Sequence, residues 1–215
     1  MFYRIISFFS LLIILSSCQK KHEIVIAIQP LGNFENNLSD TVKNALQEFY
    51  GYKVVILKKQ EIPKSTFVNI RSPRYRADLL IKYFKKNKPD SVDYIIALTN
   101  QDISITKRNN LGIIKEPKSK YIDFGIFGLG YMPGVSCVVS TFRLNNGNNK
   151  QFIKRIKKIC VHEVGHNLGL NHCPNKNCVM QDAAESIKTI DNAELGLCKN
   201  CRLFVKNKKN KKIKK

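Results

Sequence analysis

Three of the four histidines of the chain lie in one segment, HEVGHNLGLNH, which runs from His162 to His172. His162 and His166 are four residues apart, so on an α-helix they lie on one face, one turn from each other. Neutral imidazoles at this spacing can bind one Zn²⁺ together. Glu163 follows the first histidine but projects in another direction, which places its carboxylate where a general base can act on water. The segment therefore predicts a hydrolytic zinc site.

Gly169 lies where this helix must end, because glycine readily adopts the left-handed backbone conformation that ends many helices. The chain can then reverse and bring His172 back as a third ligand. Three protein ligands leave a fourth position for water, which distinguishes a catalytic zinc site from a structural one. The glycine and third histidine at fixed offsets make this pattern far more specific than H-E-x-x-H alone. The alternative is three histidines without a shared role, and no role is expected for the fourth, His22.

Four cysteines follow in two short-spaced pairs, Cys173 with Cys178 and Cys198 with Cys201. Two such pairs separated by a loop are the usual arrangement of a four-cysteine structural zinc site. Two disulfides are the alternative, because an exported chain meets an oxidising compartment. The spacing favours zinc but leaves both interpretations open. A zinc site directly after His172 would also fix the direction of that ligand.

The order H-E-x-x-H-x-x-G-x-x-H-C, four residues, C-x-M, seventeen residues, C-x-x-C resembles the archaemetzincin family of zinc metallopeptidases. The resemblance implies hydrolysis of peptide bonds by zinc-activated water, with Glu163 as general base and two Zn²⁺ per chain. It implies a catalytic zinc held by His162, His166 and His172, and a structural zinc held by Cys173, Cys178, Cys198 and Cys201. It also implies that Met180 forms the Met-turn beneath the metal. Spacing alone does not give that last role, since most methionines in such positions fill the core.

The N-terminal residues, MFYRIISFFSLLIILSSC, combine one basic residue, Arg4, with an apolar run from Ile5 to Leu15. The run is too short for a comfortable membrane span and is typical of a signal-peptide core. Leu15-Ser16-Ser17-Cys18 resembles the lipobox of bacterial lipoproteins, which implies cleavage before Cys18 and lipidation of its thiol. An ordinary signal peptide or an uncleaved anchor is the alternative. We expect an exported protein of the bacterial cell envelope, lipid-anchored to a membrane on its periplasmic or cell-surface side.

The seven cysteines of the chain then divide into three groups. One takes lipid and four take zinc. Cys137 and Cys160 remain, and both are expected to be buried thiols, since free cysteine behaves as a small hydrophobic residue. A bridge between these two is the alternative.

The chain carries a net charge of +21, and residues 206–215 contribute seven lysines. Such a run usually forms a solvated, disordered end. The alternative is contact with an anionic membrane, where a lipid at Cys18 and the basic tail would act together. Nucleic acid is not an expected partner, because the tail lacks interleaved aromatic residues and the chain is predicted to be exported. A monomer acting on peptides or proteins is expected, and acidic peptides are compatible substrates.

The pattern of aliphatic runs and amphipathic stretches predicts an α+β fold, a metzincin-like domain with a mixed twisted sheet packed with helices. The expected strands are 23–29, 52–57, 94–99 and 135–144, the last of them near the active-site cleft. The expected helices are 40–50, 72–86, 150–168 and 186–195, and residues 100–120 are predicted to be a loop. The predicted segments are 1–17 as signal peptide, 18–22 as tether, 23–204 as peptidase domain with its four-cysteine subdomain at the C-terminal end, and 205–215 as disordered basic tail.

Three functions follow from these observations. The first is an active, lipid-anchored zinc peptidase, which the complete ligand set and Glu163 favour. The second is a catalytically idle, zinc-bound binding lipoprotein. The third is a basic protein that binds nucleic acid or an envelope polymer, with zinc serving only structure.

Overall fold

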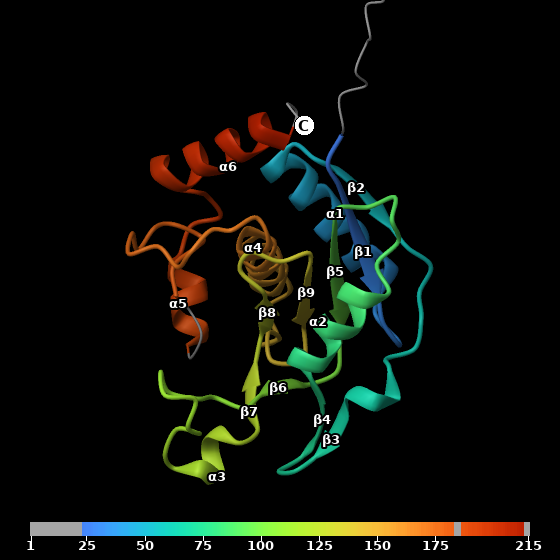
Figure 1. The fold of residues 1–215 in the computed structure, drawn as a ribbon, viewed down its shortest axis with the longest axis vertical. Helices are drawn as coiled ribbons and strands as arrows, with labels where there is room; N and C mark the ends of the chain where they lie inside the picture. Colours follow the sequence, from blue (N-terminus) through green and yellow to red (C-terminus); the bar gives the residue numbers. More distant parts are fainter. Residues whose placement is uncertain (1–22, 183–185, 213–215) are drawn as a thin grey trace, which may run out of the picture.

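A five-stranded sheet, ordered β2-β1-β5-β9-β8, runs through the computed structural model, which describes residues 23–182 and 186–212 (Figure 1). Its strands are β1 (Val25–Pro30), β2 (Lys53–Ile56), β5 (Tyr94–Thr99), β8 (Gly128–Gly130) and β9 (Ser136–Ser140). Strands β2, β1, β5 and β9 pair in parallel, whereas β8 pairs with β9 antiparallel and forms an edge of the sheet. The predicted mixed sheet is confirmed.

Helices cover both faces of this sheet. Helices α1 (Asn36–Tyr50) and α4 (Asn149–Asn167) pack on one face, and α2 (Ala77–Lys86) packs on the other. The alternation along β1 explains the two layers, because Ile26 and Ile28 join the core under α1 and α4 while Ala27 joins the core under α2. Both layers are therefore built around strands buried on two sides, as parallel strands usually are.

A second, four-stranded sheet has the order β3-β4-β6-β7. Its strands are β3 (Phe67–Asn69), β4 (Pro73–Arg76), β6 (Ile103–Ile105) and β7 (Phe124–Ile126), and the short helices η1 (Lys64–Thr66) and α3 (Lys118–Tyr121) lie beside it. The predicted helix 72–86 is wrong in its first turn, since residues 73–76 form β4. Arg74 explains the difference, because its guanidinium pairs with the buried carboxylates of Asp102 at 2.7 Å and Asp123 at 3.3 Å. The predicted loop 100–120 is likewise interrupted by β6.

The other predicted elements agree with the structure apart from their ends. Strands β1, β2 and β5 and helices α4 and α5 (Ile187–Asn192) lie where they are predicted. Helix α1 begins at Asn36, four residues early, and its first turn buries Leu38 against the core. Strand β9 is shorter than the predicted segment 135–144, because the chain turns after Ser140.

The C-terminal segment departs from the prediction of disorder after residue 204. Helix α6 (Lys199–Lys212) continues through most of it, since Val205 is buried in the core and the Lys208 ammonium donates a hydrogen bond to the carbonyl of Leu168. No helix in 23–182 or 186–212 is long and apolar enough to cross a membrane. The predicted signal peptide (1–17), the tether (18–22) and Cys18 itself lie outside the described residues.

An ion pair joins α5 to α4. The Arg155 guanidinium donates two hydrogen bonds to the Asp191 carboxylate, at 2.7 and 2.6 Å, and a third to the carbonyl of Leu144 at 2.7 Å. Arg155 is buried, so this charge depends on its partner. Hydrogen bonding from Arg155 in turn holds the pKa of Asp191 below its usual range.

Replacing Asp191 by Asn should lower the free energy of unfolding at neutral pH by about 2 kcal/mol, because Arg155 loses a charged acceptor. A depressed carboxyl pKa stabilises the fold above the pKa of the unfolded chain, about 4, and this contribution is lost as the pH falls through the lower folded pKa. Urea unfolding of the two proteins between pH 2 and pH 7 should therefore show curves that converge in acid. Exposed Asp90, changed to Asn, is the control, and an unchanged difference across this range would contradict the assignment.

Candidate active site

Helix α4 ends as its sequence predicts. Gly169 adopts φ 94°, and its N–H donates to the carbonyl of His166 while the N–H of Leu170 donates to that of Gly165. These two bonds form the Schellman arrangement that closes many helices. The chain then turns back beside the helix and brings His172 to the two helical histidines.

The three imidazoles converge. The ring centroids of His162 and His166 are 4.5 Å apart, and that of His172 is 5.4 and 4.9 Å from them. One nitrogen from each ring lies within 4.8 Å of the other two. The sequence-predicted ligand set is therefore brought together at one point.

Backbone carbonyls set the direction of the two helical rings. Nδ1 of His162 lies 2.8 Å from the carbonyl oxygen of Val179, and Nδ1 of His166 lies 2.8 Å from that of Leu170. A carbonyl can only accept, so each Nδ1 carries the proton and each Nε2 presents a lone pair. Burial lowers the pKa of His162 to about 4 and also lowers that of His166, so both rings are neutral at pH 7.

This arrangement fits a bound cation. The two Nε2 atoms are 2.9 Å apart, and two facing lone pairs at that distance repel each other. A Zn²⁺ bonded to both nitrogens at about 2.0–2.1 Å would remove the repulsion and is a common partner of neutral imidazole. The carbonyl partners are of the kind that orient histidine ligands in zinc proteins.

Glu163 lies beside this cluster beneath the edge strand β8. A Cβ on Gly128 would come within 2.7 Å of its Oε1, and one on Gly130 within 2.8 Å of its backbone oxygen. Glycine at both positions therefore lets the strand lie directly against the carboxylate. Burial raises the pKa of Glu163 to about 8, and a cation at the histidines would oppose this shift. Sequence reasoning missed both glycines, although the alternation GLG marks a strand in close contact with another group.

Met180 packs beneath the histidine-bearing helix. A Cβ on Gly165 would lie 2.5 Å from its Sδ, and Met180 is fully buried. Its carbonyl accepts a hydrogen bond of 2.8 Å from the N–H of Cys173. The carbonyl of Val179, one residue earlier, is the hydrogen-bond partner of His162 Nδ1. The methionine thus packs against α4 at Gly165, the residue before His166, and fills space there.

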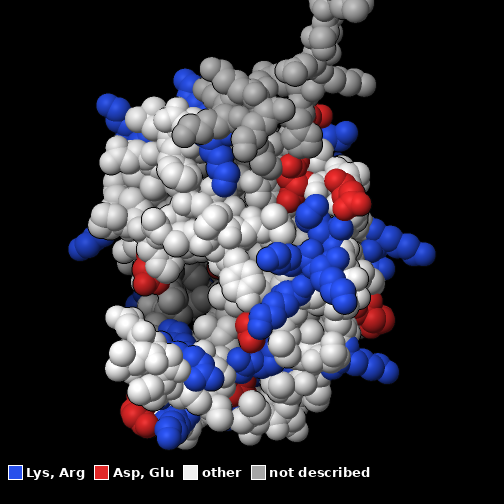
Figure 2. All heavy atoms as spheres, viewed as in Figure 1, with Lys and Arg blue, Asp and Glu red and all other residues white. Residues whose placement is uncertain are grey.

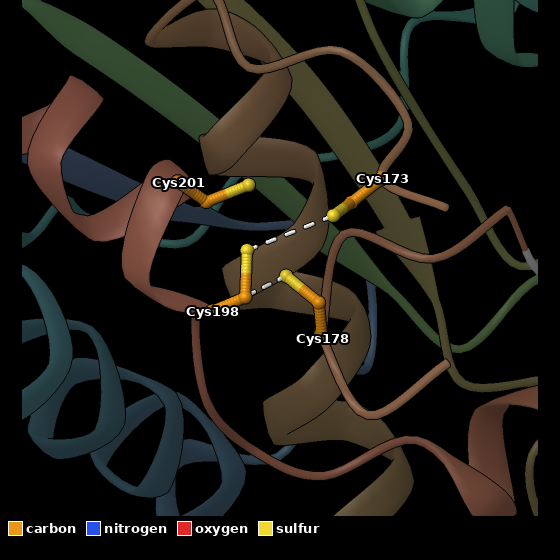
Figure 3. Close-up of side chains that lie close together, drawn as sticks. All are labelled: Cys173, Cys178, Cys198 and Cys201. Atoms are coloured by element: carbon orange, nitrogen blue, oxygen red, sulfur yellow. Dashed lines mark hydrogen bonds between the residues drawn. The ribbon is translucent and has the colours of Figure 1, made fainter. Parts of the chain in front are cut away.

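The four cysteines form a second cluster (Figure 3), which includes Cys173, the residue directly after His172. Their Sγ atoms all lie within 4.8 Å of one another, and those of Cys173 and Cys198 are 3.7 Å apart. A disulfide requires about 2.0 Å, whereas two sulfurs bound to one Zn²⁺ at about 2.3 Å are roughly 3.8 Å apart. The backbone N–H of Cys201 lowers the pKa of Cys198 to about 7, which favours the thiolate that binds metal.

The other two cysteines in the described part of the chain, Cys137 and Cys160, are buried free thiols, as predicted.

A cleft of about 520 Å³ opens beside the histidines, and Figure 2 shows this side of the molecule hollowed. Strand β8 forms one wall, and helices α4 and α5 form the other. Asn167, which sequence reasoning also missed, holds the loop at one end of the cleft. Its Nδ2 donates to the carbonyls of Tyr131 at 3.0 Å and Ser136 at 2.9 Å. The position of Asn167 between the candidate ligands His166 and His172 was the only signal for this role in the sequence.

Comparison with known proteins agrees with this site. Residues 21–207 match the family model described as Peptidase family M54. The archaemetzincin of Halobacterium salinarum is 31% identical over 84% of this chain and 98% of its own length, and that of Haloarcula marismortui is 30% identical over 82% and 96%.

Two solved structures share the fold. The crystal structure of archaemetzincin from Methanopyrus kandleri has a TM-score of 0.70 at 24% identity, over 86% of this chain and 95% of that one. The crystal structure of archaemetzincin from Archaeoglobus fulgidus, complexed with malonate, has a TM-score of 0.67 at 24% identity, over 84% and 99%.

The fold, the matched family and the histidine cluster together define a zinc-dependent metallopeptidase. Within that class, the chain belongs to Peptidase family M54, the archaemetzincins. The α+β, metzincin-like fold expected from the sequence is confirmed.

Replacing Gly165 by Ala should lower the free energy of unfolding by about 1–3 kcal/mol, because the new methyl group would overlap the Met180 sulfur. Urea denaturation of the purified proteins measures the difference. Gly196→Ala is the matched control, since nothing lies within 4 Å of a Cβ built there. Equal stability of the two variants would show that Met180 does not press against α4.

Proposed function

We propose that His162, His166 and His172 hold the catalytic zinc and that Glu163 is the general base of peptide-bond hydrolysis. The observation that carries this proposal is the pair of Nε2 atoms 2.9 Å apart, both aimed by carbonyl partners at Nδ1. Zinc bound there would lower the pKa of a water molecule and polarise the substrate carbonyl. Met180 supports the site by packing and is not a ligand.

Glu163 moves the proton in this reaction. Its carboxylate takes a proton from water as the oxygen attacks the amide carbon, and then gives a proton to the nitrogen of the leaving amine. The carboxylate lies beneath β8 and beside the histidines, so it faces the place where a peptide in the cleft would be cleaved. Burial keeps bulk water from competing for the proton.

An extended substrate binds along the outer edge of β8. The strand uses one edge to pair with β9, from Gly128–Val139 to Gly130–Cys137, and as the edge strand of the sheet it has its other side available for backbone hydrogen bonds. The glycines of this strand carry no side chains to hold the peptide away from Glu163.

A second zinc binds Cys173, Cys178, Cys198 and Cys201, which gives two zinc ions per chain. Three features support this proposal: the distance of 3.7 Å between Cys173 and Cys198, the thiolate favoured at Cys198, and the four sulfurs in one cluster. The site would fix Cys173 and with it the direction of His172.

We further propose that the enzyme is a monomeric lipoprotein of the bacterial cell envelope, cleaved before Cys18 and anchored by lipid on that residue. The export and anchoring depend on the leader sequence alone, because the matched relatives named above are archaeal. The family match begins at residue 21, so the leader precedes the matched domain. A basic C-terminal helix would add attraction to an anionic membrane.

Replacing Glu163 by Gln should lower the rate of peptide cleavage by about 10²–10⁴-fold while zinc content stays unchanged. A library of unbiased peptides followed by mass spectrometry gives the rate, and metal analysis of the same sample gives the zinc content. Exposed Glu194, changed to Gln, is the control. Full activity of the Glu163 variant would refute its role, and absence of cleavage by the unchanged protein would favour an idle binding protein.

Replacing Cys198 by Ser should lower the zinc content from two ions per chain to one, because a four-sulfur site loses a central ligand. Metal analysis after dialysis measures this, and Cys160→Ser, at a thiol outside the cluster, is the control. One zinc in the unchanged protein, with its thiols oxidised in pairs, would contradict the second site.

Replacing Cys18 by Ser should abolish incorporation of labelled palmitate in a bacterial host and release the protein from the membrane fraction. His22→Ala, in the polar leader, is the control. Equal labelling of the Ser variant would exclude Cys18 as the lipidated residue.

A further inference from the structure

Helix α6 presents apolar and basic side chains together on its exposed side. Leu203 is 48% exposed and Phe204 is 46% exposed, and the side chains of Arg202 and Lys206 next to them are exposed as well. The helix contains seven lysine and arginine residues and no aspartate or glutamate. Neighbouring apolar side chains in so basic a segment suit a partner that is both apolar and negatively charged.

The other side of α6 is occupied by the protein itself. Val205 is buried in the core, Cys201 belongs to the cysteine cluster, and the Lys208 ammonium donates a hydrogen bond to the carbonyl of Leu168. Positions 201, 205 and 208 are four and three residues apart, so they lie on one face of the helix. Leu203, two residues from both Cys201 and Val205, therefore points away from the core. The packing of α6 fixes which of its side chains face outward.

The composition of the exposed side matches a membrane surface. Helices that lie in the bilayer interface combine lysine and arginine with leucine and phenylalanine, as α6 does. Anionic lipid headgroups attract basic side chains near the membrane, and the whole chain carries a net charge of +21. Charge complementarity therefore favours an anionic bilayer as the partner of this face.

The position of α6 in the fold favours the same partner. Figure 1 shows the start of β1 at the same end of the molecule as α6. Cys18, the proposed site of lipidation, precedes Glu23 by five residues, which span at most about 18 Å when fully extended. A lipid on Cys18 would thus hold this end of the protein, and with it α6, close to the bilayer.

We propose that the exposed side of α6 binds the surface of an anionic membrane, with Leu203 and Phe204 inserted at the interface. The proposal rests on the proposed location in the bacterial cell envelope. Three exposed basic residues contact the headgroup phosphates: Lys199, Arg202 and Lys206. Their long side chains keep the charge at the phosphates while the apolar side chains reach deeper. The hollow of the cleft lies farther from this end (Figure 2), so the bound enzyme keeps its cleft open to peptides.

The first test uses tryptophan fluorescence, because the chain contains no tryptophan of its own. The full chain with Leu203→Trp is purified from a bacterial host and reconstituted in vesicles whose acyl chains carry bromine, a quencher. On phosphatidylglycerol the emission should shift to shorter wavelength and be quenched, and on phosphatidylcholine both effects should be much weaker. Phe67→Trp is the matched control, since Phe67 is also 48% exposed but lies on β3, at the opposite end of the molecule (Figure 1).

The control position should stay unquenched on both lipids. Equal quenching at positions 203 and 67 would overturn the proposal, because it would show no preferred orientation. Equal quenching at position 203 on the two lipids would overturn it as well, because the negative charge of the lipid would then have no role.

The second test removes the charges from α6. The Leu203→Trp protein receives Lys199→Gln, Arg202→Gln and Lys206→Gln together. Each basic residue near an anionic surface contributes roughly fivefold to binding, so the ratio of membrane-bound to free helix should fall roughly 100-fold and the quenching should disappear. The control changes three exposed lysines of α2 to Gln: Lys82, Lys85 and Lys86. Quenching that persists without the three α6 charges, or is lost equally in the control, would overturn the proposal.

Labelling with palmitate separates this inference from the proposed lipid anchor. Labelled protein without quenching at position 203 keeps the anchor and overturns the α6 surface. Quenching in unlabelled protein, added to the vesicles and recovered with them by sedimentation, supports the α6 surface and refutes the anchor alone. Unlabelled protein that does not sediment with phosphatidylglycerol vesicles overturns both.

Discussion

Two unprotonated imidazole nitrogens held 2.9 Å apart place the strongest demand on this fold. Such a pair is stable only with a shared positive charge. Several elements of the fold hold the two nitrogens in this position. Helix α4 supplies the spacing, and the carbonyls of Val179 and Leu170 fix the protons on the outer nitrogens. Those carbonyls belong to the segment that returns after Gly169, so the way the helix ends also determines the direction of the two histidine rings.

The same returning segment links the histidine cluster to the cysteine cluster. Cys173 follows His172 directly, and its N–H bonds to the carbonyl of Met180, which itself packs under Gly165. A distortion at the cysteines would therefore reach His172 through a single peptide unit. The family is one of zinc-dependent peptidases, and this arrangement gives a physical reason for the cysteine cluster to lie so near the histidine cluster.

Much of the site could be predicted because its chemistry is local in the sequence. Residues 162–180 carry the histidines, Glu163, the terminating glycine and Met180 within one helix and one turn, where spacing determines geometry. The buried strands β1 and β5 were equally clear, since continuous aliphatic runs indicate them. The extent of α6 was not clear, because Val205, the buried residue that packs α6 against the core, lies in a lysine-rich segment.

The parts that sequence could not supply depend on distant partners. The residues of β4 look like the start of a helix in the sequence. In the structure they form a strand, in which Arg74 pairs with Asp102 and Asp123 from other segments. Strand β8 is only three residues long, and its role comes from lying over Glu163. Both are tertiary effects that override local preference.

The most direct test of the proposed catalytic zinc site is anomalous diffraction from crystals of the zinc-loaded protein, with data collected on both sides of the zinc absorption edge. We expect one strong peak bounded by His162, His166 and His172, with Glu163 beside it but outside bonding distance. A structure without a peak at that position, or with the three imidazoles turned apart, would contradict it.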